Sequence, residues 1–187
     1  LISEISPEEL INIISDLEID EIVDILQILP NKKTENILSA MSQRDRQRIQ
    51  EALEYPEDSA GGLMNTDIIS VRPKHNLEVV MRYLRAQREL PKNTDQIFVV
   101  SRENKYLGSL PISTIVVSDP SLNVRELMET ETQPLEAHLN DKDVSRLFEQ
   151  NDWVSAPVVD DKSSLIGRIT IDDVIDVIME DADQNFL

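Results

Sequence analysis

Residues 167–183 read GRITIDDVIDVIMEDAD, and this stretch predicts a short strand that turns into an amphipathic helix. Thr170 and Asp173 have the spacing of a capping box, with an aspartate in place of the usual Glu or Gln. The apolar residues of the predicted helix recur at the i, i+3, i+4, i+7 spacing of a buried face; they are Ile171, Val174, Ile175 and Ile178. The helix is therefore expected to pack one face into a core.

The other face of this predicted helix carries a column of acids. Asp172, Asp176 and Glu180 are four residues apart, and no Lys or Arg follows Arg168. Such a column is commonly a solvated face. Here, however, the acids repel one another and continue toward the negative C-terminal end of the helix, where carboxylates are unfavourable. A hard divalent cation bound through oxygen atoms would neutralise them.

Length and charge limit the classes of partner. A chain of 187 residues with 40% hydrophobic content can form one large or two small domains with buried cores. Its formal net charge of -18 argues against nucleic acid or an anionic membrane surface as a direct partner and favours cations or a basic protein surface. The absence of cysteine excludes disulfides and thiolate metal sites.

Several other classes are disfavoured. The two histidines, His75 and His138, lie far apart in the sequence, so a bound metal is expected to be Mg²⁺ or Ca²⁺ rather than zinc. No nucleophile stands beside a suitable base, so an enzyme is not expected. No apolar run is long enough to span a membrane, and we expect a soluble excerpt of a longer protein that begins here at Leu1.

Residues 1–54 are predicted to be helical throughout. A capping box with proline at the first helical position, Ser6-Pro7-Glu8-Glu9, opens the first helix. Asp20 is predicted to cap a second helix that Pro30 ends, and Asp24 shares its face. Taken alone, these two acids are read as a cap and a solvated side chain. Further helices are predicted at 33–41 and 42–53, which gives a small superhelical bundle.

Residues 55–65 interrupt the helical pattern with Pro56 and the pair Gly61-Gly62. A single Gly-Gly pair is a weak phosphate-loop signal because no Walker-type lysine follows it. The stretch is predicted to be a linker.

Beyond this linker the chain repeats itself. Gly108-Ser109-Leu110 returns as Gly167-Arg168-Ile169, with a helix start after each. Each copy is predicted as a β-α-β-β-α unit, and two copies can bury faces that one would expose. The other matching segments are 64–66 and 128–130, 68–71 and 132–135, 77–84 and 142–148, and 97–100 and 156–159.

The repeat resembles a tandem pair of cystathionine-β-synthase (CBS) domains. In the second copy, the strand before an acidic turn (Val158-Val159-Asp160-Asp161) and the signature Gly167-x-x-Thr170-x-x-Asp173 carry this likeness. Together with the helical region and the stretch YPEDSAGGLM (55–64), the order of segments resembles the cytosolic region of MgtE-type magnesium transporters over the whole chain.

This resemblance implies an α+β fold in which a small helical N domain precedes the CBS pair. The implied domains are a helical N domain truncated at its start (1–54), a linker (55–65), a first CBS repeat (66–127) and a second CBS repeat (128–183). Residues 184–187 would begin the connection to a membrane domain that is absent from this chain.

The resemblance also implies Mg²⁺ sites. In the family, ions lie between the N domain and the CBS pair and across the CBS dimer. Asp20 and Asp24 match family acids that would face Asp173. Asp152 and Asp176 match a second site, and Asp181 matches an acid of the connecting region. Departures from the pattern, which imply one missing cation site or weaker ones, are Asn140, Lys142, Gln184 and Asn185.

The function implied is a cytosolic Mg²⁺-sensing region that gates an attached magnesium transporter or channel. It would work as a homodimer, joined through its CBS domains, at the cytoplasmic face of the inner membrane, with Mg²⁺ or another divalent cation as ligand and no nucleic acid. In this hypothesis, bridging ions close the N and CBS domains, which repel each other at low Mg²⁺.

An adenine-nucleotide sensor is the alternative, because CBS pairs often bind nucleotides between their repeats. Trp153 could stack on a base or anchor the core. Pro111 and Thr114 stand where the first copy of the signature wants Ser or Thr and then Asp, so one ribose contact is missing. ATP is therefore ranked below Mg²⁺. A passive dimerisation module without any ligand is a third alternative.

Overall fold

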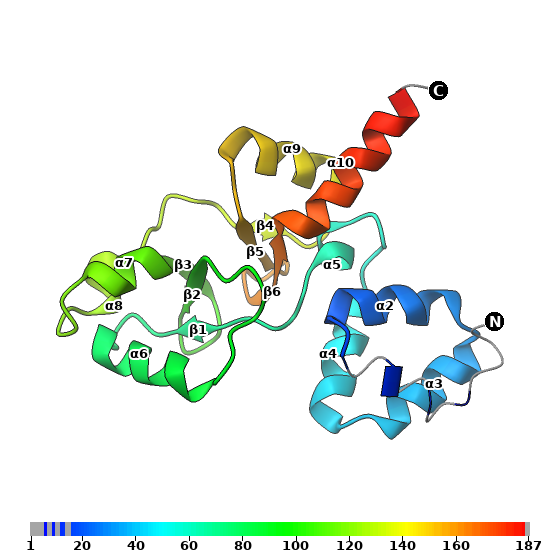
Figure 1. Cartoon of the computed structure of the whole chain (residues 1–187), viewed down its shortest axis with the longest axis horizontal. Helices are drawn as coiled ribbons and strands as arrows, with labels where there is room; N and C mark the ends of the chain where they lie inside the picture. Colours follow the sequence, from blue (N-terminus) through cyan, green and yellow to red (C-terminus); the bar gives the residue numbers. More distant parts are fainter. Residues whose placement is uncertain (1–5, 7–8, 10–11, 14–15, 186–187) are drawn as a thin grey trace.

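The computed structural model describes residues 6, 9, 12, 13 and 16–185, apart from the side chains of residues 19, 20, 51, 52, 184 and 185. Three bodies follow one another along the chain: a helical N domain and two units that each combine a small sheet with helices (Figure 1). The predicted α+β class is confirmed. Among the described residues, no helix is both long enough and apolar enough to cross a membrane.

The N domain contains α2 (Ile19–Ile28), α3 (Asn31–Ala40) and α4 (Gln43–Leu53), close to the helices expected there. The cap of α2 differs from the prediction. Glu18 occupies the N-cap and forms a capping box with Glu21, so Asp20 lies inside the first turn instead. The capping box of the first helix is present between Ser6 and Glu9, but most of that helix falls outside the described residues.

The apolar faces of these helices form a separate core. Its buried members are Ile22, Val23, Leu26, Leu29, Ile37, Leu38 and Ile49. Burying a side chain of this size contributes about 1.5–3 kcal/mol. The N domain therefore has its own source of stability, independent of the CBS pair.

Each CBS repeat has the predicted order of elements. The first contains β1 (Ser70–Val71), α6 (Leu77–Ala86), β2 (Gln96–Val100), β3 (Tyr106–Pro111) and α7 (Ile112–Val117). The second contains β4 (Leu135–Glu136), α9 (Asp141–Asn151), β5 (Ser155–Val159), β6 (Leu165–Thr170) and α10 (Ile171–Asn185). In both sheets the first strand is parallel to the second and the second antiparallel to the third. The register shifts at equivalent places, Val99/Val100 and Val158/Val159.

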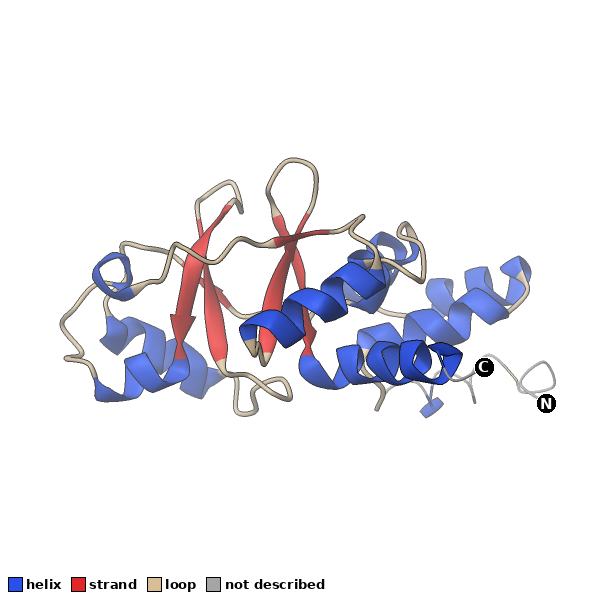
Figure 2. Cartoon of the chain, turned by 90° about the horizontal axis from the view of Figure 1, so that it is seen from above, coloured by secondary structure: helices blue, strands red, loops and turns tan. Residues whose placement is uncertain are grey.

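The two sheets lie side by side with helices around them (Figure 2). The strand-to-helix prediction for 167–183 is confirmed by β6 and α10. The helix buries Val174 and Val177, whereas Ile175, which the spacing placed on the buried face, is 47% exposed. The C-terminal end of α10 points away from the sheets (Figure 1).

The repeats exchange short helices, which the sequence did not predict. α8 (Val124–Leu127) leads into the second repeat, yet Glu129 just after it forms backbone hydrogen bonds of 2.9 and 2.8 Å with Ser109 of β3. α5 (Ala60–Leu63) leads into the first repeat, yet Asn65 just after it forms two backbone hydrogen bonds of 2.8 Å with Arg168 of β6. Each short helix thus packs on the repeat other than the one whose strands follow it in the chain.

The stretch 55–65, predicted to be a linker, therefore packs as a structural part of the second repeat. The backbone N–H groups of Ala60 and Gly61 donate to the carbonyls of Leu139 and Ala137, both at 2.8 Å. A Cβ at Gly62 would lie 2.3 Å from the carbonyl oxygen of Pro56. The glycine pair permits close backbone packing here.

Candidate metal-binding site

A cavity of about 580 Å³, here called the acidic cavity, lies between the N domain and the second repeat. Its lining comes from α2, the segment around α5, the start of α9 and one face of α10. No Lys, Arg or His occurs among the described residues that line it. The seven acids in its lining are Asp24, Glu57, Asp58, Asp141, Asp173, Asp176 and Glu180.

Local structure explains why these acids converge. Asp173, Asp176 and Glu180 have the i, i+3, i+7 spacing of one helix face on α10. The backbone N–H of Asp141 donates to the carbonyl of Asp58 at 2.9 Å, which holds the start of α9 against the turn before α5. Asp24 approaches from α2 of the N domain. The cavity is therefore formed by segments that are far apart in the sequence.

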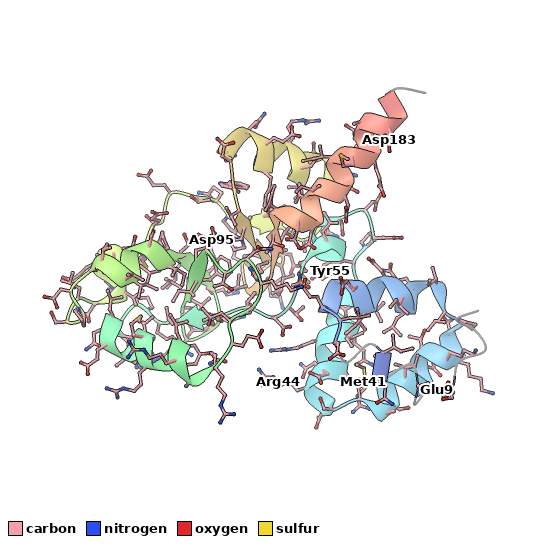
Figure 3. The ribbon with its side chains drawn as sticks, viewed as in Figure 1. Glu9, Met41, Arg44, Tyr55, Asp95 and Asp183 are labelled. Atoms are coloured by element: carbon pink, nitrogen blue, oxygen red, sulfur yellow. The ribbon has the colours of Figure 1, made fainter. Side chains whose placement is uncertain are left out.

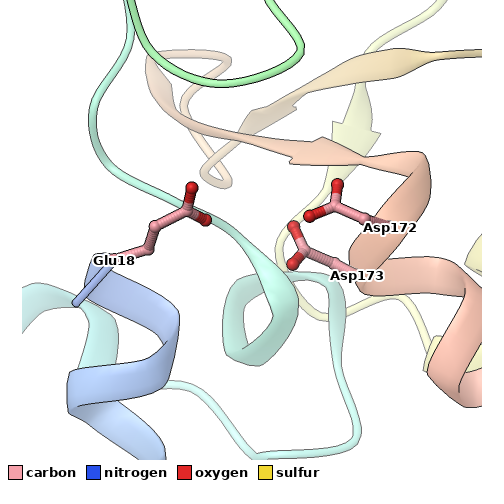
Figure 4. Close-up of side chains that lie close together, drawn as sticks. All are labelled: Glu18, Asp172 and Asp173. Atoms are coloured by element: carbon pink, nitrogen blue, oxygen red, sulfur yellow. The ribbon is translucent and has the colours of Figure 1, made fainter.

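A trio of carboxylates adjoins this cavity (Figure 4). Glu18, Asp172 and Asp173 each offer one carboxylate oxygen, and these oxygens lie within 4.8 Å of one another. The side-chain amide of Asn65 donates to Glu18 at 3.2 Å and to Asp173 at 3.4 Å. The backbone N–H and the hydroxyl of Thr170 both donate to the Oδ2 atom of Asp173, at 3.4 and 3.0 Å. The capping role predicted for Asp173 is present, and its carboxylate also faces the N domain.

Burial and crowding raise the pKa values of several of these acids. Burial raises the pKa of Asp24, and the charges of Glu57 and Asp173 raise it further. Burial likewise raises the pKa of Glu18, with added repulsion from Asp173 and Asp172. Burial also raises the pKa of Asp141. The ionised forms of these groups are thus disfavoured without a cation, and carboxylate oxygens are ligands suited to Mg²⁺ and Ca²⁺.

The structure brings together three of the six acids predicted as metal ligands, Asp24, Asp173 and Asp176. Asp20 lies in α2, but its side chain is outside the described part of the chain. Asp152 is exposed at the C-cap of α9, away from the lining of the acidic cavity. Asp181 is exposed and forms an ion pair of 3.7 Å with Lys142.

Trp153, the predicted base-stacking residue, packs edge-on against Phe148 with ring centroids 5.5 Å apart. It also lines a hollow of about 590 Å³ beside β4, which Leu135 and Leu147 share. The ring is therefore partly a core anchor and partly the wall of a pocket.

The sequence-based selection did not include several acids of this site. Asp172 and Glu180 belong to the acidic column of α10, and Glu57 and Asp58 belong to the quoted 55–64 stretch. Asp141 follows the cap of α9. Sequence spacing gives no signal for Glu18, because its neighbours in the trio are brought to it only by the packing of the N domain against α10.

A second cavity of about 460 Å³, here called the mixed cavity, adjoins the trio at Glu18. Arg48 and Asp67 form an ion pair of 2.5 Å there. Arg44 extends from α4 toward the CBS pair (Figure 3). The charged residues in its lining are the acids Glu18, Asp45, Asp67 and Glu89 and the bases Arg44, Arg48, Lys92 and Arg168.

Family models match both parts of the chain. Residues 1–58 match the MgtE intracellular N domain, and residues 60–119 and 124–180 match the CBS domain. The chain belongs to the CBS-domain family and carries an MgtE N domain in front of its CBS pair.

Curated relatives agree with this family. The chain is homologous to the magnesium transporter MgtE of Thermus thermophilus, with 32% identity over 142 residues that make up 76% of this chain and 32% of the relative. It is 27% identical to MgtE of Bacillus subtilis over 80% of this chain and 33% of that protein. The chain thus spans about a third of the length of these two relatives.

Solved structures have the same fold. A crystal structure of the soluble part of a magnesium transporter matches with a TM-score of 0.88 and 25% identity, over 96% of this chain and 70% of that one. The cytosolic domain of the Mg²⁺ channel MgtE in complex with ATP matches with a TM-score of 0.82 and 29% identity, over 94% and 77%. The arrangement expected from the sequence, a helical N domain before a CBS pair, is confirmed.

Proposed function

We propose that this chain is the Mg²⁺-sensing regulatory region of a magnesium transporter or channel. The acidic cavity carries the proposal. This cavity lies where the N domain meets the second CBS repeat. Among the described residues, its lining has seven carboxylates and no basic side chain. Such a surface favours binding of a hard divalent cation and opposes closure without one.

The donor set fits Mg²⁺. All candidate ligands are carboxylate oxygens, and the chain has no cysteine for a softer metal. Mg²⁺ usually keeps several of its waters and uses one or two carboxylates. A cavity of about 580 Å³ has room for a hydrated ion. Ca²⁺ and Mn²⁺ also prefer oxygen ligands, so selectivity among divalent cations is part of the test.

The proposed mechanism is a shift between two domain arrangements. Without divalent cations, Glu57 and the acids of α10 repel Asp24, and this repulsion shifts the chain toward an open arrangement in which the N domain separates from the second repeat. With cations bound, Asp20, Asp24, Asp173 and Asp176 hold the domains closed. Such a shift requires that cations bind the closed form more tightly than the open one.

The readout of this shift would be α10. The helix contributes to the acidic cavity and extends beyond the second repeat (Figure 1). In the proposal it transmits closure to a pore domain at the cytoplasmic face of the inner membrane. The active unit is a homodimer through the CBS domains, and Asp152 and Asp181 would contribute to ion sites outside the acidic cavity.

Adenine-nucleotide sensing is a second candidate. A relative that is 29% identical has a structure in complex with ATP, and Trp153 lines a hollow here. Against it, Pro111 and Thr114 interrupt the ribose-binding pattern of the first repeat. Nucleotide binding at Trp153 therefore ranks second.

The test is a titration of the purified chain with Mg²⁺, Ca²⁺ or ATP, read by radius of gyration and melting temperature at fixed ionic strength. We expect Mg²⁺ to compact and stabilise the chain and the triple variant Asp24→Asn, Asp173→Asn, Asp176→Asn to lose both responses. A control triple, Glu103→Gln, Glu131→Gln, Asp161→Asn, removes the same charge at exposed positions and should respond normally. An unresponsive wild type, or a responsive site triple, would overturn the proposal. A response to ATP alone, lost in Trp153→Ala, would favour the second candidate.

A further inference from the structure

Arg168 is a buried cation at the edge of the carboxylate trio. The residue is only 5% exposed, which is rare for arginine. Its Nη1 atom donates to the carbonyl of Asn93 at 3.2 Å, and its Nη2 atom donates to the carbonyl of Lys92. Among the described residues it forms no ion pair within 4.0 Å. Its charge is therefore held in place by backbone oxygens and is not cancelled by a single partner.

Acids of the site act electrostatically on this guanidinium beyond ion-pair distance. Burial lowers the pKa of Arg168, while Glu18, Asp173, Asp95 and Asp172 act in the opposite direction. Asp95 lies where the two repeats meet (Figure 3) and accepts a hydrogen bond of 2.5 Å from Ser155. An arginine remains protonated at physiological pH. The trio thus lies near a permanent positive charge that lines the mixed cavity with Glu18 and is absent from the lining of the acidic cavity.

Arg168 also positions other groups around the trio. Its backbone pairs with Asn65, whose amide donates to Glu18 and Asp173. The loop that its guanidinium holds carries Asn93, whose amide donates to Asp172 at 3.1 Å. The same loop carries Lys92, whose charge lowers the pKa of Glu18. The backbone of Arg168 thus supports the donor to Glu18 and Asp173, and its side chain holds the loop that supplies a donor to Asp172 and a second cation near Glu18.

The first repeat provides an internal comparison. Gly108 pairs with Val99 as Gly167 pairs with Val158, so Ser109 of β3 is the counterpart of Arg168. The counterparts of Asp172 and Asp173 are then Ser113 and Thr114. The repeat that does not carry the trio has neither the acids nor the arginine. Acids and countercharge occur together in the copy that faces the N domain.

We infer that Arg168 is a fixed internal cation that sets how many divalent ions the closed form requires. This inference rests on the proposed function. The guanidinium and the loop that it holds offset part of the repulsion within the trio, so a fraction of the chain closes without metal. Divalent cations then complete closure at the acidic cavity. Without Arg168, the trio would need additional positive charge from solution.

The experiment measures closure by energy transfer between dyes on Ser39→Cys, exposed on the N domain, and Ser121→Cys, exposed in the first repeat. The chain has no other cysteine, so labelling is specific. Labelled chains are diluted into unlabelled ones to suppress transfer between subunits. Mg²⁺ is titrated at fixed ionic strength into wild type, Arg168→Met, Arg168→Lys and the control Arg82→Met. The control removes the same charge from an exposed pair on α6.

We expect Arg168→Met to raise the metal-free ratio of open to closed chains by about fivefold or more, within the usual range of coupling between sites. The slope of closure against Mg²⁺ concentration should also become steeper, because more ions are needed. Arg82→Met should change neither quantity. Arg168→Lys should retain more metal-free closure than Arg168→Met, and adding Glu18→Gln to Arg168→Met should restore closure.

The outcomes separate this inference from the proposed function. A wild type that does not close with Mg²⁺ would sink the proposed function. If wild type closes with Mg²⁺ but Arg168→Met matches Arg82→Met in metal-free closure and in slope, only the role of Arg168 is contradicted. If Arg168→Met does not fold in saturating Mg²⁺, the double variant with Glu18→Gln and the Lys variant decide, since a purely structural role predicts no rescue by loss of an acid.

Discussion

The acidic cavity and the mixed cavity both adjoin the carboxylate trio, the first at Asp173 and the second at Glu18, but their charges differ. The acidic cavity has seven acids in its lining and no basic residue among those described. The mixed cavity has four acids and four bases, including the ion pair between Arg48 and Asp67. One side of the contact between the N domain and the CBS pair is therefore balanced by the chain itself. The other side is left for cations from solution.

This division gives a physical reason for a graded response. A contact made only of opposed acids would open fully without metal, and a fully paired one would not respond to metal at all. Charge-balanced contacts at the mixed cavity keep the domains near each other. The unbalanced acids of the acidic cavity make full closure depend on bound cations.

The largest expected effect comes from the backbone that forms the wall of the acidic cavity. In Gly62→Ala the new Cβ would lie 2.3 Å from the carbonyl oxygen of Pro56 and 2.7 Å from that of Glu57. The turn that carries Glu57 and Asp58 must then move. We expect a loss of about 1–3 kcal/mol in the free energy of unfolding, typical of overpacking. Urea denaturation measures it, with Ser39→Ala on the exposed surface of α3 as control. Wild-type stability in Gly62→Ala would contradict the close packing described for this turn.

A smaller effect is expected from Asp24→Asn, which should raise stability without metal but reduce the stabilisation by Mg²⁺. Removing this repelled carboxylate should raise the metal-free free energy of unfolding by about 0.5 kcal/mol, the size of a like-charge pair. The same change should reduce the stabilisation gained from Mg²⁺, because a ligand is lost. Thermal unfolding with and without Mg²⁺ measures both, and Asp161→Asn is the exposed control. If metal-free stability falls instead, Asp24 is held by an attraction that the acidic cavity does not explain.

The pH dependence of metal-free stability follows from the raised pKa values of Asp24 and Glu18. In the folded chain these groups hold protons at a pH where the unfolded chain has released them. Their contribution to stability is fully present below the unfolded pKa values and is lost as pH rises through the folded ones. Stability without metal should therefore increase as pH falls from about 7 toward about 5.

Mg²⁺ should flatten or reverse this slope, since it stabilises the ionised carboxylates. The double variant Glu18→Gln, Asp24→Asn should show a weaker dependence than wild type. Denaturation curves at a series of pH values provide the measurement. Stability that falls steadily with acidification in metal-free buffer would argue against crowded acids at this contact.

The smallest expected effect concerns Lys142, one of the departures from the family pattern. Lys142 forms an exposed ion pair with Asp181, and pairs of this kind contribute little to stability. Its charge competes with cations near α9 and α10. Lys142→Gln should raise the apparent Mg²⁺ affinity by less than about threefold and leave stability within about 0.5 kcal/mol. Calorimetric titration compares it with Lys74→Gln, an exposed lysine of the first repeat. Equal Mg²⁺ affinities in the two variants would show that Lys142 does not compete with bound cations.

Periodicity and repetition were enough to predict most of the fold. The apolar spacing of Ile171, Val174, Ile175 and Ile178 predicts α10, although Ile175 is exposed in the structure. The return of the Gly108 segment at Gly167 predicts two equivalent sheets. The exchange of α5 and α8 could not be predicted, because short helices pack by tertiary contacts that leave no periodic pattern. The predicted cap of α2 is wrong. Asp is a common capping residue, which favoured Asp20, but Glu18 occupies the N-cap because it forms a reciprocal capping box with Glu21.

The candidate site was predicted only in part for a similar reason. Asp24, Asp173 and Asp176 came from family likeness and do line one cavity. Glu18 and Asp141 were missed, since their proximity to α10 depends on how separate domains pack. Arg168 is the last basic residue before the acidic column, but nothing in the sequence indicates that its side chain is buried.

The most direct test of the central claim is anomalous diffraction from crystals of this chain grown with Mn²⁺, which shares the oxygen preference of Mg²⁺. We expect an anomalous peak in the acidic cavity, coordinated by Asp24 from the N domain and by Asp173 or Asp176 from α10. Closed domains with manganese bound only elsewhere, or separated domains in saturating Mn²⁺, would contradict it.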